Sequence, residues 1–160
     1  MSPIRIGQGI DVHAFEAGDH LMICGVKIPF NQGFKAHSDG DVALHALCDA
    51  ILGAAGLGDI GHHFPDTDAE WAGADSAMLL NKVIDAASEA GWVTSNCDLT
   101  IVAQAPRLAP HIEAMRLRVA ELLGLPRNAV NIKATTSEHL GFTGRKEGVA
   151  AFAVCLLQAK

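Results

Sequence analysis

The chain has 160 residues, with 12 Lys or Arg against 18 Asp or Glu, which gives a formal charge of -6. This length suits one domain, spanning residues 1–160, that can bury a substantial core. The acidic balance and the absence of any basic run argue against a nucleic-acid surface, because such surfaces need clustered cations. An anionic ligand would therefore have to be held by a metal ion or by local backbone donors.

The four cysteines, Cys24, Cys48, Cys97 and Cys155, are scattered and form no Cys-x-x-Cys pair. Neither a thiolate metal site nor a dense disulfide framework is indicated, and a reducing cytoplasm is the expected compartment. The first residues lack a signal-peptide pattern, and the longest apolar run, 149–157, is too short to span a bilayer. We expect a soluble cytoplasmic protein, or a stromal one if the source is a plant and this is the mature chain.

The N-terminal part predicts two strands, a loop and a helix. Residues 4–13 read as a strand, and 21–28 as a hairpin broken at Gly25. Residues 30–38 are predicted to form a loop. In 41–55 the apolar residues recur at helical spacing, which predicts an amphipathic helix.

Residues 56–73 are rich in Gly, Asp and Pro and are long for a connection in a compact domain. Loops of this kind are usually functional or mobile, so we interpret this one as an active-site loop. A second helix is predicted over 75–90, because its apolar residues are in helical register and Gly91 is a good C-terminal cap. An alternating pattern over 92–104 predicts a strand.

The remaining elements follow a turn at 106–110. An apolar stripe from Ile112 to Leu122 predicts a helix that Gly124 ends. Two further strands are predicted over 130–136 and 148–157. Together the elements predict a single α/β domain of the α+β type, in which a mixed β-sheet is covered by helices on one face and a small hairpin is added.

Asp11 and His13 form an Asp-x-His pattern on the first predicted strand, and His45 lies on the first predicted helix. Side chains alternate along a strand, so the two strand residues point the same way, while Val12 is expected to turn back to the core. An Asp-His-His set with an open fourth position is typical of a working zinc site, and two imidazoles favour Zn over Mg or Ca. From spacing alone the three can equally be ordinary polar residues.

Asp41 and Asp49 stand one helical turn on either side of His45. They could hold its imidazole in the tautomer that a metal requires, or could merely belong to a solvated helix face. Just before this helix, residues 37–41 could offer free amides to an anion, or Ser38 or Asp39 could act as the N-cap.

A second polar cluster occupies residues 133–145, after a predicted strand. Its hydroxyls and backbone amides could bind phosphate, Glu138 could hold a hard cation, and Arg145 could pair with anionic oxygens. The same composition is also ordinary for a strand that leads into a turn.

Four segments, GQGIDVHAF, AHSDGDVALHALCDAILGAAGLGDIGHHFPDTD, QAPRLAPHI and KATTSEHLGFTGR, together resemble the 2-C-methyl-D-erythritol 2,4-cyclodiphosphate synthase family of the non-mevalonate isoprenoid pathway. The resemblance runs from about Ile4 to the last predicted strand. It implies a phosphorus-oxygen lyase that cyclises 4-diphosphocytidyl-2-C-methyl-D-erythritol 2-phosphate and releases CMP. It also implies a homotrimer with its active sites between subunits.

By this resemblance Asp11, His13 and His45 are ligands of one Zn per subunit, and Glu138 contacts Mg or Mn on the substrate diphosphate. His37 and Thr136 resemble transition-state stabilisers, with Ser38 beside the phosphates. The loop implied to hold the methylerythritol part comprises Asp59, Ile60, Gly61, Phe64, Pro65, Asp66, Thr67 and Asp68. The cytidine and diphosphate pocket, presented from the adjacent subunit, is implied to comprise Ala103, Gln104, Ala105, Pro106, Arg107, Leu108, Ala109, Thr135, Thr136, Ser137 and Glu138.

Some positions vary from the common family pattern. Arg107 stands where Lys is frequent, which keeps the charge and changes its geometry. His62 and His63 fall in a variable part of the loop and are left out of the zinc site. Phe142 and Arg145 resemble residues that line a cavity on the trimer axis, where family members can hold an isoprenoid diphosphate.

Two other classes of protein are compatible with these residues. One is a zinc-dependent phosphohydrolase that activates water at the open metal position, although no general base is evident beside the ligands. The other is a non-catalytic trimeric protein that binds nucleotides or isoprenoid diphosphates. The first would release inorganic phosphate or open-chain products, and the second would bind without turnover.

Overall fold

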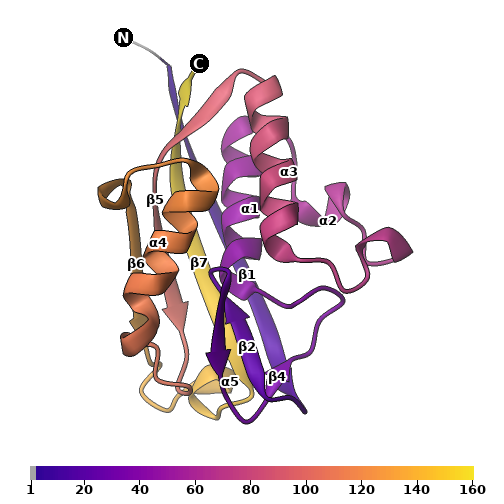
Figure 1. The fold of residues 1–160 in the computed structure, drawn as a ribbon, viewed down its shortest axis with the longest axis vertical. Coiled ribbons are helices and arrows are strands. Elements are labelled where there is room, and N and C mark those ends of the chain that lie inside the picture. The colour runs from indigo at the N-terminus through magenta and orange to yellow at the C-terminus, as the bar shows by residue number, and fades with distance from the viewer. Residues whose placement is uncertain (1–2) are drawn as a thin grey trace.

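The computed structural model describes residues 3–160 as a mixed sheet with helices packed on one face and a small hairpin beside it (Figure 1). Neighbouring strands in the five-stranded sheet follow the order β4-β1-β7-β5-β6. All neighbours are antiparallel except β5 and β6, which are parallel. The predicted fold class is thereby confirmed. Among the described helices, none is long and apolar enough to cross a membrane.

The large sheet is built mainly from three long strands: β1 (Ile4–Glu16), β5 (Trp92–Val102) and β7 (Gly148–Ala159). Two shorter strands, β4 (Gly33–Phe34) and β6 (Val130–Thr135), form its edges. The prediction of a plain loop over 30–38 was wrong at β4, where Phe34 pairs with Phe15. The strand β1 accordingly runs to Glu16, beyond its predicted end at residue 13.

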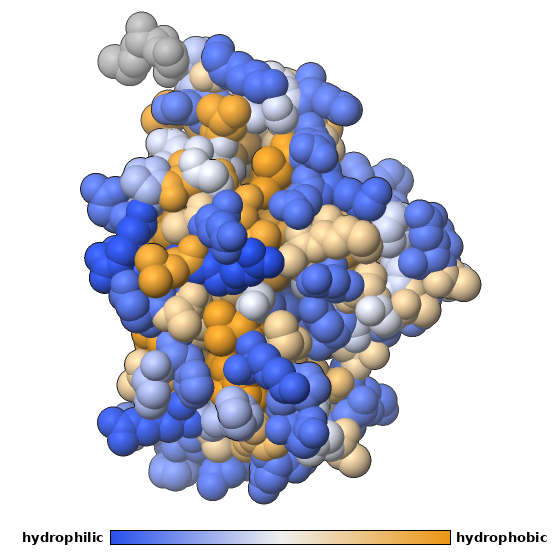
Figure 2. All heavy atoms as spheres, viewed as in Figure 1, coloured by the Kyte–Doolittle hydropathy of each residue, from blue (hydrophilic) through white to orange (hydrophobic). Residues whose placement is uncertain are grey.

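The helical layer consists of α1 (Val42–Ala55), α3 (Ser76–Glu89) and α4 (Ile112–Leu123), close to their predicted bounds. α1 packs against β1 and β7, α3 lies beside α1, and α4 covers β6. In the view of Figure 2 the outer surface of this layer is mainly hydrophilic with scattered apolar groups. The apolar sides of these helices therefore face the sheet and form the core with it.

Two glycines allow α1 to approach β1 at backbone distance. A Cβ built on Gly7 would lie 1.9 Å from the carbonyl oxygen of Ala50, and one built on Gly9 would lie 1.9 Å from that of Ala46. Any larger residue at either position would have to push the helix away from the strand. The sequence thus fixes how closely α1, which carries His45, packs against the strand that carries Asp11 and His13.

Within residues 3–160, the opposite face of the sheet is bare along β1 and β7. On β1 the even-numbered residues point to this face, and Ile6 is 72% exposed and Val12 50% exposed. On the neighbouring strand Phe152 and Val154 are also exposed. The prediction that Val12 turns back to the core was therefore wrong, because the helices cover the other face, where the glycines lie.

The hairpin pairs β2 (His20–Ile23) with β3 (Val26–Pro29), as predicted. Its two-residue turn has positive φ at both Cys24 and Gly25, which is the type I′ geometry that suits the twist of a hairpin. The carboxylate of Asp41 accepts hydrogen bonds from the backbone N–H groups of both turn residues. The hairpin turn is therefore fastened to the start of α1.

The predicted active-site loop over 56–73 contains two short elements, α2 (Ile60–His63) and a 3₁₀ turn (Ala69–Trp71). Asp59 caps α2 and Asp68 caps the 3₁₀ turn through their side chains. The polar cluster after β6 contains one further turn, α5 (Gly141–Gly144). Further 3₁₀ turns, Ala109–His111 and Arg127–Ala129, flank α4.

Candidate functional site

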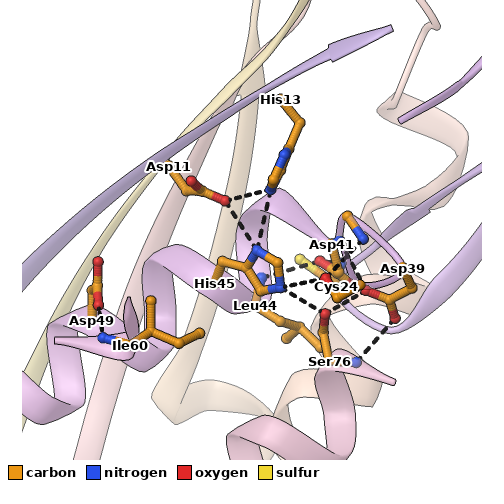
Figure 3. Close-up of polar contacts among 12 residues, drawn as sticks. Asp11, His13, Cys24, Asp39, Asp41, Leu44, His45, Asp49, Ile60 and Ser76 are labelled. Atoms are coloured by element: carbon orange, nitrogen blue, oxygen red, sulfur yellow. Dashed lines mark hydrogen bonds and ion pairs between the residues drawn. The ribbon is translucent and has the colours of Figure 1, made fainter. Parts of the chain in front are cut away.

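Asp11, His13 and His45 come together where β1 passes the first turns of α1 (Figure 3). His13 Nε2 lies 2.8 Å from Asp11 Oδ2 and 3.2 Å from His45 Nδ1. His45 Nδ1 lies 3.1 Å from the same carboxylate oxygen. The expectation that the strand residues share a face and meet the helix residue is confirmed.

The three ligand atoms are close enough for one metal ion. They all lie within 4.8 Å of one another. Ligand atoms bonded to a tetrahedral zinc at about 2.0–2.1 Å would lie about 3.3 Å apart, which is close to the contacts seen here. Three ligands from protein side chains leave a fourth position free for substrate or water. The residues therefore fit a divalent metal ion of the kind that imidazole and carboxylate bind.

The electrostatics of the group match a cation site. Burial by itself raises the pKa of Asp11, but hydrogen bonds and charge interactions with His13 and His45 lower it to about 2. Burial by itself lowers the pKa of His45, but the Asp11 carboxylate raises it. Without a metal, the carboxylate thus favours the protonated form of His45, and a cation bound at the same place would interact with the carboxylate instead.

The two carboxylates that flank His45 along α1 do not contact its imidazole. Asp41 is fully buried, caps α1 at Leu44 and holds the hairpin turn. Asp49 accepts a hydrogen bond from the backbone N–H of Ile60 and so fixes the start of α2. The idea that they hold the imidazole tautomer was wrong, as was the alternative of a solvated face for Asp41. Asp41, and not Ser38 or Asp39, is also the N-cap.

His45 Nε2 instead faces two hydroxyls. Ser76 Oγ, at the start of α3, lies 2.8 Å away, and Ser38 Oγ lies 3.2 Å away. Ser76 in turn donates to Asp39. Ser76 is separated from His45 by 31 residues, so no local pattern in the sequence could have revealed this contact.

Asp11, His13 and His45 line a cavity of about 360 Å³. His37 and Ser38 form one part of its wall, before α1. Another part comes from the α2 loop and the residues after it. The lining residues from that loop that were expected to bind substrate are Ile60, Gly61, Phe64 and Asp66. The cavity lining does not include Asp59, Pro65, Thr67 or Asp68.

Sequence reasoning missed four residues of this wall: Lys35, Ala36, Trp71 and Leu79. Trp71 packs edge-on against Phe64, with ring centroids 4.9 Å apart, and Lys82 lies over its indole ring. Lys35 is exposed and stands two residues before His37. An aromatic residue in a Gly- and Asp-rich loop is a signal that could have identified Trp71.

A second cavity, of about 490 Å³, lies where the parallel strands β5 and β6 end. It brings together the segments 103–109 and 134–136, which are distant in sequence. The Ala103 N–H donates to the Thr135 carbonyl, which continues the pairing of the two strands. The residues expected to form the nucleotide pocket that do line it are Ala103, Gln104, Pro106, Arg107, Leu108, Ala109, Thr135 and Thr136.

The loop after β6 is held by internal contacts. Ser137 Oγ lies 2.6 Å from Thr143 Oγ1 and 2.7 Å from the Leu140 carbonyl oxygen, so its hydroxyl is used within the loop. Glu138 is exposed and has a positive φ of 55°, with its N–H donating to Thr136 Oγ1. Neither Glu138 nor Ser137 lines either of the two cavities.

The two residues suggested for an axial cavity, Phe142 and Arg145, are both exposed. Phe142 lies in α5, and Arg145 Nη2 forms an ion pair with Glu147 at 3.0 Å. His62 and His63, left out of the metal site, do not join it, and His63 Nε2 contacts the Leu57 carbonyl oxygen.

Comparisons with known proteins agree with this arrangement. Residues 4–158 match the model of the YgbB family. The chain is 62% identical over 160 residues to 2-C-methyl-D-erythritol 2,4-cyclodiphosphate synthase of Alcanivorax borkumensis, covering 100% of both chains. A solved structure of the bifunctional IspDF from Campylobacter jejuni matches with a TM-score of 0.96 and 46% identity, over 100% of this chain and 43% of that one.

A structure of 2C-methyl-D-erythritol-2,4-cyclodiphosphate synthase in a CDP-bound form matches with a TM-score of 0.88 and 41% identity. It covers 96% of this chain and 99% of that one. The fold and the site therefore define a protein of the cyclodiphosphate synthase class. The chain belongs to the YgbB family, as the resemblance of its motifs indicated.

Proposed function

We propose that this chain converts 4-diphosphocytidyl-2-C-methyl-D-erythritol 2-phosphate to 2-C-methyl-D-erythritol 2,4-cyclodiphosphate and CMP, in the non-mevalonate route to isoprenoid precursors. The observation that carries the proposal is the meeting of Asp11, His13 and His45 in one cavity. The chain that carries this group also matches, over its full length, a relative named for this reaction.

The reaction needs no covalent protein intermediate. An oxygen of the substrate's 2-phosphate attacks the β-phosphorus, and the bond between that phosphorus and the oxygen bridging to the α-phosphate breaks. The bridging oxygen and its electron pair leave with CMP. The protein's task is to fold the flexible substrate so that the attacking oxygen and the leaving oxygen are in line, and orientation of this kind can supply about 7–11 kcal/mol.

Zinc is the metal that we assign to Asp11, His13 and His45, one ion per subunit, because a site with two imidazoles, one carboxylate and an open position suits it. When bound, the ion would polarise phosphate oxygens and neutralise their charge. The three side chains hold their ligand atoms in place before the substrate arrives, since α1 packs directly against β1.

Other residues of the chain are assigned to the phosphates and their charge. His37 and Ser38 lie in the wall of the metal cavity, where the 2-phosphate and β-phosphate would sit. Thr136 is exposed at the second cavity and can donate its hydroxyl to a phosphate oxygen as charge develops. Glu138, exposed beside it, would hold Mg or Mn on the diphosphate.

The two cavities share no lining residue. We assign the first to the methylerythritol and phosphate part of the substrate, and the second to the cytidine diphosphate part. Asp59, Pro65, Thr67 and Asp68 would support the first through the loop. Ala105 and Ser137 would support the second. One substrate molecule would then contact the first cavity of one copy of the chain and the second cavity of a neighbouring copy.

The bare face of the sheet supports a homotrimer. It carries exposed apolar side chains on two central strands: Ile4, Ile6, Ile10, Val12, Phe152 and Val154. Exposed apolar clusters of this extent mark interaction surfaces, and packing copies against each other would bury them. Phe142 and Arg145 would then lie near the axis of the assembly, where an isoprenoid diphosphate could bind.

The function is tested by incubating the purified protein with the proposed substrate, Zn and Mg, and following the products by phosphorus NMR and mass spectrometry. CMP and cyclic diphosphate in equal amounts, lost when a chelator is added, are the expected result. Inorganic phosphate or open-chain products would instead indicate a phosphohydrolase. Substrate that binds and stays intact would indicate a binding protein.

A further inference from the structure

Two polar side chains, Ser76 and Asp39, form a hydrogen-bonded chain behind the proposed metal ligand His45 (Figure 3). His45 Nε2 lies 2.8 Å from Ser76 Oγ, and Ser76 Oγ donates to Asp39 Oδ1. The Ser76 backbone N–H also donates to Asp39 Oδ2 at 3.0 Å. Ser76 is fully buried, and it joins the start of α3 to the loop that precedes α1.

The direction of these hydrogen bonds determines which nitrogen of His45 carries a proton. An ionised carboxylate can only accept, so the hydroxyl proton of Ser76 points to Asp39. The oxygen of Ser76 then presents a lone pair to His45, and Nε2 must be the protonated nitrogen that donates to it. When a metal ion is bound, the unprotonated nitrogen of His45 is then Nδ1, which lies beside Asp11 and His13.

The anchor of this chain is itself well fixed. Asp39 accepts a third hydrogen bond, from the backbone N–H of Asp41 at 3.0 Å, in addition to the two from Ser76. These bonds tie the carboxylate to the N-cap of α1 and to the first residue of α3. The orientation of the imidazole is therefore coupled to the packing of two helices of the core.

Ser38 is the other hydroxyl near His45 Nε2, at 3.2 Å. This contact is longer than the one from Ser76. The Ser38 oxygen also accepts a hydrogen bond from the backbone N–H of Gly40. Ser38 lines the cavity that we assign to the phosphates. It can therefore turn toward a bound phosphate, whereas Ser76 is buried and held by Asp39.

We propose that Ser76 and Asp39 are positioning residues, which fix the imidazole of His45 with Nε2 protonated and Nδ1 free to bind the metal ion. The inference rests on the metal site of the proposed function. Partners of this kind, which hold a metal-bound histidine through its other nitrogen, typically change metal affinity by about 10- to 100-fold.

The first test is the affinity of the full-length protein for Zn²⁺, measured by competition with a chromophoric chelator. Ser76→Ala should weaken zinc binding by about 10- to 100-fold. The matched control is Ser88→Ala, the same substitution near the other end of α3, and it should leave the affinity unchanged. Circular dichroism should report an unaltered fold for both, since the backbone N–H of residue 76 can still donate to Asp39.

The second test observes the Nε2–H group of His45 in the zinc-loaded protein by long-range ¹H–¹⁵N NMR of the histidine rings. In the wild type this proton should exchange slowly with solvent, because Ser76 accepts it, and Ser76→Ala should speed its exchange. Asp39→Asn should also speed the exchange, because an amide can donate to Ser76 and turn the hydroxyl hydrogen toward Nε2. A structural role alone would not move this signature.

The outcomes separate this inference from the proposed function. If wild-type protein binds zinc and forms the cyclic product, but Ser76→Ala keeps the same zinc affinity and the same exchange rate at Nε2–H, the positioning role is wrong and the function stands. If the wild-type protein binds no zinc, the metal site is wrong and the inference fails with it.

Discussion

The α-carbon of Gly9 on β1 faces the carbonyl oxygen of Ala46 on α1 so closely that an added Cβ would lie 1.9 Å from that oxygen. Ala46 directly follows His45, the proposed metal ligand, and Gly9 lies two residues before Asp11 on the same face of the strand. The spacing between the two elements that carry the ligand group is therefore set by a residue without a side chain.

Gly9→Ala should reduce the free energy of unfolding by about 3 kcal/mol or more, because the methyl group forces α1 away from β1. Zinc affinity should fall with it. Gly53→Ala is the matched control: it lies in α1, is exposed and has nothing within 4 Å of the added Cβ. It should raise stability by about 0.5–1 kcal/mol. Urea unfolding of both variants tests this, and equal stabilities would contradict the close packing.

His45→Ala should yield a folded protein that retains no zinc and forms no cyclic product. The imidazole lies mostly in polar contacts and adds little to the apolar core. Metal analysis of the purified variant and product detection by phosphorus NMR provide the measurement. His20→Ala, on the hairpin, is the control and should keep both zinc and activity. Full activity of a zinc-free His45→Ala protein would refute the metal assignment.

Thr136→Ala should lower turnover by about 10²-fold or more, while the affinity for CDP falls much less, if its hydroxyl acts on charge that develops in the transition state. Steady-state kinetics and calorimetric titration with CDP separate the two effects. Thr94→Ala, at the far end of β5, should change neither. A loss of CDP affinity as large as the loss of turnover would instead make Thr136 a simple binding residue.

Burial raises the pKa of Asp41 to about 7, against the opposing hydrogen bonds from Gly25 and Leu44. The folded state then binds the proton more tightly than the unfolded chain, whose carboxyl has a pKa near 3.8. The free energy of unfolding contributed by this group is thus largest below pH 3.8 and falls as pH rises toward about 7. Asp41→Asn should remove that component from urea-unfolding curves measured across this range, and an unchanged slope would contradict it.

Ile6→Lys should prevent assembly, because a charged side chain would have to be buried without a partner when the bare sheet face packs against other copies. Size-exclusion chromatography with light scattering should give a trimer for the wild type and smaller species for the variant. Leu117→Lys, a comparable exchange on the exposed side of α4, should remain trimeric. A wild-type monomer with full activity would overturn the proposed active site between subunits.

The sequence predicted the elements and the ligand group well, because these depend on local rules. Alternation along β1 brought Asp11 and His13 to one face, and the helical spacing of 41–55 placed His45 on a helix. The assignment of Val12 to the core failed because an apolar residue in a strand looks the same whether helices or other copies of the chain cover it. The glycines at 7 and 9 were the signal for the covered face.

The parts of the site that were missed depend on contacts between distant residues. Ser76 meets His45 only when α3 packs beside α1, and Trp71 enters the cavity only through the fold of the α2 loop. Asp41 and Asp49 have the right helical spacing for His45, but backbone donors from the hairpin and from α2 hold their carboxylates. Spacing identifies neighbours on one element and cannot show which partners compete for them.

The first helix, α1, carries His45 of the proposed metal site and lies in the centre of the core. It also holds the hairpin through Asp41 and α2 through Asp49. A cation bound to His45 is for this reason coupled to the cooperative unfolding of the whole chain and not to a local loop. Metal loading should therefore slow amide hydrogen exchange at buried positions of β7 and α3, which are tens of residues from Asp11, His13 and His45 in the sequence. The slowing should grow with the ratio of the free metal concentration to its dissociation constant.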